Sequence, residues 1–334
     1  MRKYPFPAFP NGWFQLAWSD EVAPGEVRSL HAFGKKLVLY RTDGGEARVF
    51  DAHCPHLGAD LGVGGKVEGD SIRCPFHGWR FGEGGRCVEV PYAKRIPPAA
   101  ALRPWTVREH SGLVMVWHHA EGKGPDGDVP ALSEFGDAAW TPYERRHWRI
   151  RTHNHEMGEN QVDRAHFRFV HGTLEVPECE AEPEGPVFRV YQRSKMATPR
   201  GPIIGKIDIT AYGYGVSLVR FSGIVDTLLI ACVTPVDGES VDVNFAFTVK
   251  KLASAEATGG VGKALIADIE KQMREDTPIW ENKVYHERPL LCDGDGPIAQ
   301  YRRWARQFYS GLDEPAQRAG DPEPAAQSRQ GGTA

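Results

Sequence analysis

Two short segments of the chain each pair a cysteine with a histidine. One residue separates Cys54 from His56, seventeen residues follow, and two residues separate Cys74 from His77. Two thiolates and two imidazoles are the ligand set of a Rieske [2Fe–2S] cluster, in which the imidazoles replace thiolates on one of the two irons. This replacement raises the reduction potential to roughly −150 to +300 mV. The pattern therefore predicts an electron carrier that can supply oxygen chemistry.

The neighbours of these cysteines and histidines suit two stiff loops. Pro55 and Pro75 directly follow the cysteines, and Gly58 and Gly78 end the two segments. A structural zinc site is the alternative, because two cysteines and two histidines can also hold Zn²⁺ tetrahedrally. Zinc sites usually combine a Cys-x-x-Cys pair with a His-x-x-x-His pair, so mixed pairs favour the iron–sulfur cluster.

A second group of metal-binding residue types lies in one short segment, which holds Asp163, His166 and His171. Five residues of an ideal helix turn through about 500°, which leaves the two histidines roughly 140° apart. Both can face one ion only if the helix ends or bulges between them, so we expect irregular backbone from Phe167 to Val170. Two histidines and one carboxylate form the facial triad of non-haem Fe(II) oxygenases, which leaves positions open for O₂. Taken alone, the two histidines would by default be hydrogen-bonded core residues.

The third ligand is expected on a later helix. Asp276 follows Ile269 and Met273 on the apolar stripe of that helix, so its carboxylate should face the core. A buried unpaired charge is costly, and a metal ion is one of the few partners that compensates it. A salt bridge or a helix-end effect is the alternative explanation for Asp276, and Asp163 is the alternative third ligand. Three other carboxylates of this helix lie on other faces and are expected to be solvated: Glu270, Glu275 and Glu281.

Length and composition set the limits of the fold. A chain of 334 residues suggests about two domains, and the formal net charge of −4 gives no reason to expect nucleic acid as a partner. The N-terminus runs into prolines, and we find neither a signal peptide nor an apolar stretch of about 18 residues, so we expect a cytoplasmic chain without a membrane span. The remaining cysteines are scattered and are expected to be reduced: Cys87, Cys179, Cys232 and Cys292.

The pattern of apolar residues and turns predicts two domains. Short β-like runs with glycine-rich turns fill the first part of the chain, and Glu121 to Pro130 has the composition of a linker. The second part is expected to form one antiparallel sheet and a helix from Gly262 to Glu287, and the tail from Asp313 is expected to be disordered. We therefore expect a first domain at 1–120, a second at 121–312 and a tail at 313–334. The predicted strands include Lys36–Arg41, Ala47–Asp51, Gly112–His118, Ile207–Tyr212, Ser217–Phe221, Thr227–Val233 and Val241–Val249.

With both metal motifs in this order and spacing, the sequence resembles the oxygenase components of Rieske non-haem iron oxygenases over almost its whole length. It is most similar to the branch of 3-ketosteroid 9α-hydroxylases and cholesterol 7-desaturases. The resemblance implies an α+β fold, in which an all-β Rieske domain precedes a helix-grip catalytic domain with an antiparallel sheet around a long helix. It is carried by Asp51–Ala59, Cys74–Trp79, and a C-terminal stretch through Ile279–Lys283, Arg288–Leu291, Asp295–Ile298 and Tyr301–Trp304.

The resemblance also implies roles for particular residues. His166, His171 and Asp276 match the ligands of the mononuclear iron, and Asp163 matches a carboxylate that bridges toward a Rieske histidine. A carboxylate that accepts from the imidazole of His166 would fix its tautomer and raise its basicity. Asn160 corresponds loosely to an asparagine near the iron. In the family the two iron sites of one chain are too far apart for fast electron transfer, so the resemblance implies a head-to-tail homotrimer.

The resemblance implies a terminal monooxygenase that uses O₂ to hydroxylate or desaturate an apolar polycyclic substrate, with a sterol or steroid favoured. The sequence contains no Gly-x-Gly-x-x-Gly unit after a strand and no plant-type cysteine quartet, so electrons from NAD(P)H must arrive through a separate reductase or ferredoxin. One alternative keeps this chemistry but acts on an alkaloid, an aromatic acid or a polyketide. An alternative of another class is an electron-transfer Rieske protein without oxygenase activity, although such carriers usually have about one hundred residues and lack the second histidine segment.

Overall fold

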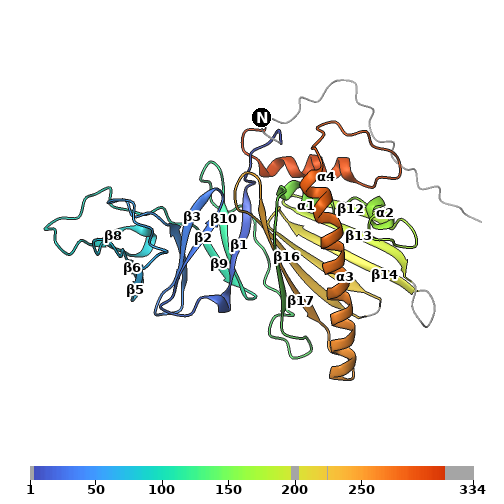
Figure 1. The fold of residues 1–334 in the computed structure, drawn as a ribbon, viewed down its shortest axis with the longest axis horizontal. Coiled ribbons are helices and arrows are strands. Elements are labelled where there is room, and N and C mark those ends of the chain that lie inside the picture. Colours follow the sequence, from blue (N-terminus) through green and yellow to red (C-terminus); the bar gives the residue numbers. More distant parts are fainter. Residues whose placement is uncertain (1–3, 197–202, 224, 313–334) are drawn as a thin grey trace, which may run out of the picture.

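The computed structural model describes residues 4–196, 203–223 and 225–312. Three small antiparallel sheets form one end of the molecule, and a larger sheet crossed by a long helix forms the other end (Figure 1). The predicted tail from Asp313 lies outside the described residues. The two-part α+β architecture agrees with the fold predicted from the sequence.

The three small sheets contain ten strands. In the first sheet β1 and β9 flank β10, in the second β2 and β4 flank β3, and the third follows the order β5-β6-β7-β8. The β-runs predicted at 36–41, 47–51 and 112–118 are confirmed as β3, β4 and β10. The elements are β1 Gly12–Trp18, η1 Ser19–Glu21, β2 Val27–Ala32, β3 Lys35–Arg41, β4 Ala47–Asp51, β5 Lys66–Glu68, β6 Ser71–Arg73, β7 Arg80–Phe81, η2 Glu83–Gly85, β8 Cys87–Glu89, β9 Val107–His110 and β10 Leu113–His118.

Strand β3 is buried on both faces, because successive side chains of a strand point to opposite sides. Leu37 and Leu39 belong to the large core that reaches into the second part of the chain. Val38 and Tyr40 belong to a separate core that also contains both Rieske-type cysteines. The strand is therefore the common wall between the predicted cluster site and the rest of the molecule.

The larger sheet has seven antiparallel strands in the order β11-β17-β16-β15-β14-β13-β12, so the single antiparallel sheet predicted from the sequence is confirmed. The long helix α3 begins at Ala255, after the side chain of Ser254 accepts a hydrogen bond from the N–H of Ala257, and it ends at Asn282. It therefore begins and ends earlier than the helix predicted from Gly262 to Glu287. The elements are β11 Glu144–Ile150, α1 Asn154–Glu159, α2 Ala165–Phe169, β12 Glu178–Glu184, β13 Val187–Met196, β14 Ile203–Tyr212, β15 Val216–Ser222, β16 Thr227–Pro235, β17 Val241–Val249, α3 Ala255–Asn282, α4 Ile298–Ala305 and η3 Arg306–Phe308.

The two faces of the larger sheet have different neighbours. One face lies under α3 (Figure 1). The opposite face packs against β1 and β10, where Trp13 and Met115 share a core with Leu218 and Ile230. At this junction a Cβ added to Gly215 would lie 1.8 Å from the carbonyl oxygen of Trp13, so only glycine permits the close approach. The small sheets are therefore joined to the back of the larger sheet, away from α3.

Candidate metal centres

The first candidate centre is formed by two matching loops. In each loop the N–H of the glycine donates to the carbonyl of the cysteine, at 2.9 Å from Gly58 to Cys54 and at 3.1 Å from Gly78 to Cys74. Both glycines need the left-handed region, with φ of 76° and 73°. The imidazoles of the two predicted histidine ligands lie 4.6 Å apart between ring centroids. The structure thus brings the two predicted histidine ligands together, and it places the two cysteines close enough for their thiols to interact.

The buried atoms of this centre fit an iron–sulfur cluster. The Nδ1 atom of His56 is buried and has no hydrogen-bond partner among the described residues, while its ring stacks on Trp79 with a centroid distance of 4.6 Å. Such an unsatisfied buried nitrogen requires an explanation, and a metal ligand is one. Both cysteines are 3% exposed, and burial together with the neighbouring Cys74 raises the pKa of the Cys54 thiol to about 11. A metal ion would deprotonate these thiols when it binds.

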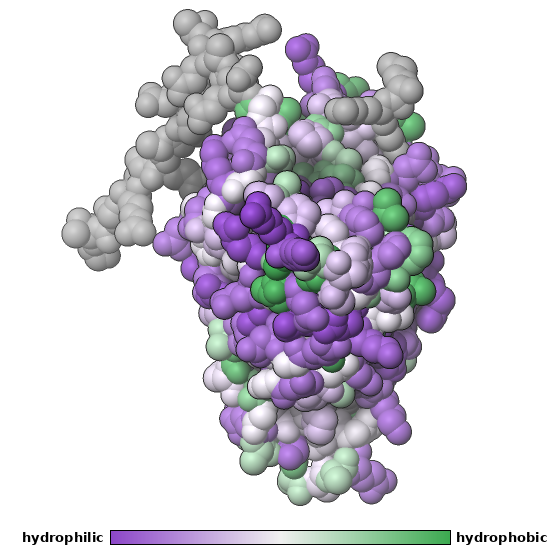
Figure 2. Space-filling model, turned by 90° about the vertical axis from the view of Figure 1, so that its left-hand side faces the viewer, coloured by the Kyte–Doolittle hydropathy of each residue, from purple (hydrophilic) through white to green (hydrophobic). Residues whose placement is uncertain are grey.

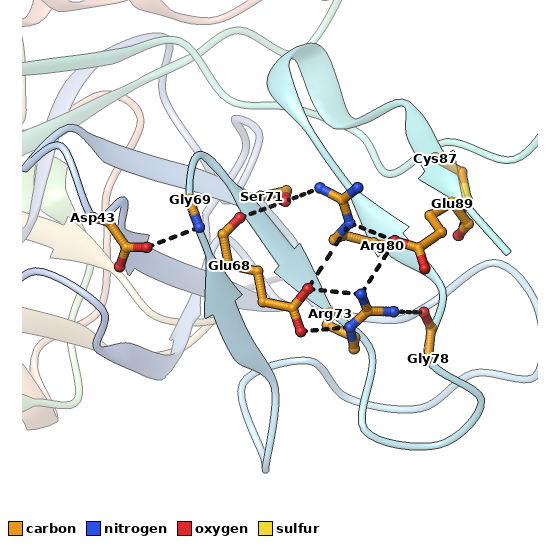
Figure 3. Close-up of polar contacts among 9 residues, drawn as sticks. All are labelled: Asp43, Glu68, Gly69, Ser71, Arg73, Gly78, Arg80, Cys87 and Glu89. Carbon is orange, nitrogen blue, oxygen red and sulfur yellow. Dashed lines mark hydrogen bonds and ion pairs between the residues drawn. The ribbon is translucent and has the colours of Figure 1, made fainter. Parts of the chain in front are cut away.

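Four charged side chains hold the second cluster loop (Figure 3). Arg73 and Arg80 stand directly before and after this loop in the sequence, and both contact Glu89, at 3.2 and 2.9 Å. Arg73 also forms a bidentate pair with Glu68, at 2.6 and 2.7 Å, and donates to the carbonyl oxygen of Gly78 at 2.7 Å. The network therefore closes the stem of the loop and fixes its last glycine.

The second candidate centre consists of His166, His171 and Asp276. One ligand atom from each lies within 4.8 Å of the others, so these three side chains form a group that could hold a metal ion. His166 lies in α2, whereas His171 follows the end of that helix at Phe169. The prediction that the helix must end between the two histidines is confirmed. The irregular backbone predicted from Phe167 was wrong, because α2 continues to Phe169 and the chain leaves the helix only at Val170.

The polar contacts at the second centre leave room for a cation. Asp276 is 6% exposed, and its carboxylate lies 3.4 Å from Nε2 of His171. The side-chain amide of Asn160 lies 3.3 Å from both Nε2 of His166 and the carboxylate of Asp276. Burial alone would lower the pKa of His171, but Asp276 and Glu275 raise it. A buried carboxylate beside two imidazoles is a donor set suited to non-haem iron.

Asp163 lies beside this group and not in it. Its carboxylate accepts from the N–H of Ala165 at 3.1 Å and is 3.7 Å from Nδ1 of His166. The main-chain carbonyl of Asp163 is closer to that Nδ1, at 2.5 Å. The nearest acceptor that fixes the His166 ring is therefore the backbone, although the sequence had suggested the carboxylate. The Asp163 side chain is 35% exposed, so its carboxylate is accessible from outside the chain.

Glu275 was predicted to be solvated, and its side chain is indeed partly exposed, at 30%, although it also has partners. Its carboxylate lies 3.0 Å from Nδ1 of His171 and forms a second pair with Lys271, also at 3.0 Å. The ring of His171 therefore spans two consecutive helix residues, with Nε2 toward Asp276 and Nδ1 toward Glu275. A carboxylate at this outer nitrogen fixes the tautomer and the orientation of a ligating histidine. The other two carboxylates predicted to be solvated also have partners, because Glu270 pairs with Arg146 and Glu281 accepts from the N–H of Arg151.

Replacement of Glu275 by glutamine should weaken iron binding at the second centre by about 10- to 100-fold, because loss of such an outer partner typically has this cost. The reason is that the amide can donate to Nδ1 and so favour the tautomer that cannot bind metal through Nε2. Competitive chelation of Fe(II) from the purified protein measures the change. Glu270→Gln, on the same helix, is the matched control and should leave iron affinity unchanged. Equal iron affinity in Glu275→Gln and in the unchanged protein would contradict the assignment.

An apolar cavity opens beside the second centre, between α3 and the larger sheet. About 160 Å³ of it is open to the centres of water molecules, and Asn160, Phe167 and Asp276 are part of its wall. Sites for small molecules are typically concave and apolar with a few polar groups, as here. Strand and helix residues supply most of the remaining wall: Ile207, Ile209, Ala211, Val219, Phe221, Leu229, Ala231, Val233, Phe245, Ile269, Met273 and Trp280.

Comparison with known protein families agrees with both centres. A family model described as the Rieske [2Fe–2S] domain matches residues 12–103, and one described as the 3-ketosteroid 9α-hydroxylase C-terminal domain matches residues 116–309. The chain is a Rieske oxygenase of the 3-ketosteroid 9α-hydroxylase family.

Known relatives cover most of this Rieske oxygenase. It is 35% identical over 327 residues to the oxygenase component of a 3-ketosteroid-9-alpha-monooxygenase from Rhodococcus rhodochrous. The aligned region covers 90% of this chain and 83% of the relative. It is 31% identical over 338 residues to cholesterol 7-desaturase nvd 1 from Ciona intestinalis. This aligned region covers 91% of this chain and 69% of the relative. These similarities place the Rieske oxygenase in the branch that the sequence motifs had suggested.

Solved structures share its fold at lower identity. Dicamba monooxygenase bound to 3,6-dichlorosalicylic acid superposes with a TM-score of 0.76 at 19% identity and covers 91% of this chain and 98% of its own. NdmA of Pseudomonas putida CBB5 with caffeine gives a TM-score of 0.74 at 20% identity, covering 88% and 89% of the two chains. The Rieske oxygenase is accordingly a non-haem iron monooxygenase that uses a [2Fe–2S] cluster, a mononuclear iron and O₂. Among its described residues no helix is long and apolar enough to cross a membrane.

Proposed function

We propose that this Rieske oxygenase is the terminal component of a multicomponent monooxygenase that hydroxylates or desaturates a sterol or steroid. The observation that carries the proposal is the apolar cavity whose wall includes Asp276 and Asn160, next to the two histidines of the second centre. A rigid hydrocarbon skeleton can fill such a cavity and exclude water from it. The relatives that act on 3-ketosteroids and cholesterol, to judge from their names, support the same substrate class.

The proposal assigns a role to each predicted site residue. Two cysteines and two histidines hold the cluster, and three side chains hold the mononuclear iron, which supplies open positions for O₂ when it is bound. The amide of Asn160 contacts both His166 and Asp276 and limits the space on the cavity side. The assigned residues are Cys54, His56, Cys74 and His77 for the cluster, and His166, His171 and Asp276 for the mononuclear iron. We assign the Rieske domain to 1–120 and the catalytic domain to 121–312.

Electron transfer is proposed to occur between subunits of a head-to-tail homotrimer. Figure 2 shows apolar side chains among polar ones on the end of the molecule that carries the β5–β8 sheet. Leu57 and Phe76 of the two cluster loops are 64% and 61% exposed there, and Phe169 beside the second centre is 82% exposed. Large exposed apolar side chains mark interaction surfaces. When one patch of a subunit binds a different patch of the next subunit, repetition of this contact can close a ring of subunits. Asp163 then lies at the junction of cluster and iron.

The electrons for this reaction are proposed to come from NAD(P)H through a separate flavin reductase or ferredoxin in the cytoplasm. The relatives are described as oxygenase components, which implies that a further component supplies the electrons. An electron carrier without oxygenase activity does not account for a second metal group beside an apolar cavity. The alternative of an alkaloid, aromatic or polyketide substrate would use the same two metal centres. The substrate assays below distinguish it from a steroid.

The test is anaerobic reconstitution of the full chain followed by assay with three probes. We expect three irons per chain, two of them with acid-labile sulfide, because four residues suit the cluster and three suit a mononuclear iron. With NADH and an added reductase as the electron source, a 3-ketosteroid and cholesterol should stimulate O₂ consumption that is coupled to product, and caffeine, as a control, should not. Zinc in place of iron would contradict the cofactor assignment. Coupled turnover of caffeine without turnover of either steroid would contradict the substrate class.

A further inference from the structure

A buried layer of ionisable side chains lies behind the cavity wall. Helix α1 presents Asn154 and Gly158 to the cavity, and these residues are one helical turn apart. The same helix carries His155, Glu156 and Glu159, which are 3%, 1% and 7% exposed. Buried ionisable groups are costly and require partners. The proposed oxygenase machinery uses none of these three side chains.

His155 connects this layer to the cavity. Its Nδ1 atom lies 2.8 Å from the hydroxyl of Tyr214, whose side chain is part of the cavity wall. Its Nε2 atom lies 3.4 Å from the carboxylate of Glu159. Nε2 has no hydrogen-bond partner among the described residues and faces the carboxylate at ion-pair distance, so a ring proton on Nε2 would point toward Glu159 and leave Nδ1 able to accept from Tyr214. Nδ1 is then a base held against the hydroxyl of Tyr214.

Glu159 is fixed as an anion. Burial alone would raise the pKa of its carboxyl, but the guanidinium of Arg302 and the imidazole of His155 lower that pKa to about 2. Arg302 binds both carboxylate oxygens, with one distance of 2.9 Å. A carboxylate held in this way is a poor carrier of protons to solvent, because protonation would break the ion pair. It instead stabilises positive charge on His155.

Tyr214 cannot lose its proton alone. Burial raises the pKa of its hydroxyl well above the ordinary value, so an isolated phenolate in this position is costly. Loss of an electron together with transfer of the proton to His155 avoids that cost, because the phenolic ring remains neutral. The arrangement therefore allows a proton to move between Tyr214 and His155.

We propose that Tyr214 and His155 form a proton-coupled redox pair that takes up an oxidising equivalent from the iron centre when O₂ is activated without hydroxylating substrate. Tyr214 gives one electron to the oxidant generated at the iron, and its O–H proton moves to Nδ1 of His155. The products are a neutral tyrosyl radical and an imidazolium beside Glu159. One electron from the Rieske cluster and return of the proton restore both residues. The inference rests on the iron centre of the proposed function and is independent of the substrate class.

The cavity wall contains a matched control for Tyr214. Tyr301 is 2% exposed and also lines the cavity, and its hydroxyl lies so close to α1 that a Cβ added to Gly158 would be 2.0 Å away. That hydroxyl donates to the main-chain carbonyl of His155 at 3.5 Å. A carbonyl oxygen accepts a hydrogen bond but does not take up the proton. Tyr301 therefore shares the cavity with Tyr214 but has no imidazole base, and its hydroxyl also hydrogen-bonds to that of Tyr214.

The test is freeze-quench electron paramagnetic resonance of the reduced, iron-loaded full chain, mixed with hydrogen peroxide in the absence of substrate. We expect a tyrosyl signal that narrows when ring-deuterated tyrosine is incorporated. Tyr214→Phe should reduce the signal at least tenfold, whereas Tyr301→Phe should leave it within about twofold. His155→Gln, which removes the base but keeps Tyr214, should also reduce it at least tenfold, and this variant decides the case if Tyr214→Phe does not fold.

Two outcomes would overturn the inference. One is a signal of equal size in Tyr214→Phe or His155→Gln. The other is no tyrosyl signal in the unchanged protein although peroxide oxidises its iron. Neither outcome depends on which substrate is hydroxylated, so failure of the steroid assays and failure of the redox pair are distinguishable.

Discussion

Replacing His171 by alanine should remove one of the three irons per chain and abolish turnover, while the red-brown Rieske spectrum remains. The two candidate centres are separate in the fold, since the cluster loops belong to the β5–β8 end and His171 contacts α3. Loss of an outer hydrogen-bond partner alone costs about 10- to 100-fold in metal affinity, so loss of a ligand should cost more. Iron and sulfide analysis with visible spectroscopy measures both centres in one sample. His166→Ala should give the same result.

The same measurement decides which carboxylate binds the mononuclear iron. Asp276→Ala should lose that iron, whereas Asp163→Ala should retain it, because the Asp163 carboxylate lies beside Nδ1 of His166 and outside the converging group. Retention of iron by Asp276→Ala together with its loss from Asp163→Ala would show that the assignment is reversed. Simultaneous loss of the Rieske spectrum and the mononuclear iron in any of these variants would refute the separation of the two centres.

Most of this site could be predicted from the sequence, because its signals are local. The cluster residues fall within two short segments, and the position of Asp276 on an apolar helix stripe indicated that its carboxylate is buried, as the structure shows. The helix end between His166 and His171 followed from the geometry of a single helix. The exact helix boundary at Val170 did not, because it depends on contacts that α2 makes with the rest of the chain.

The contacts that could not be predicted involve partners far apart in the sequence. Glu275 lies about 100° around α3 from Asp276, so a projection of that helix alone places it on another face. Its role depends on the ring of His171, which reaches across both residues from the segment after α2. The buried pair of Glu159 and Arg302 joins positions 143 residues apart, and no periodic pattern in the six residues of α1 indicates it.

The charge of Asp163 should control electron transfer between the two iron sites. Burial alone would raise the pKa of this carboxyl, but His166 and the N–H groups of Ala165 and His166 lower it, so the side chain is an anion at neutral pH. Its 35% exposure leaves it accessible to a histidine of a neighbouring cluster, and the backbone carbonyl already holds His166. The carboxylate is therefore free to serve the proposed junction between subunits.

Asp163→Asn should retain all three irons and the trimeric assembly but turn over about 10- to 100-fold more slowly. The amide keeps the shape and can still accept from the N–H of Ala165, but hydrogen bonds to a charged acceptor are roughly twice as strong as those to a neutral one. Single-turnover oxidation of the reduced Rieske cluster, with steroid and O₂ present, measures this step directly. Glu270→Gln is the matched control, because Glu270 contacts Arg146 and none of the residues assigned to the iron, so its iron content and this rate should stay unchanged. Reoxidation of Asp163→Asn at the unchanged rate would mean that the carboxylate is not on the electron path, which must then pass through other contacts between the subunits.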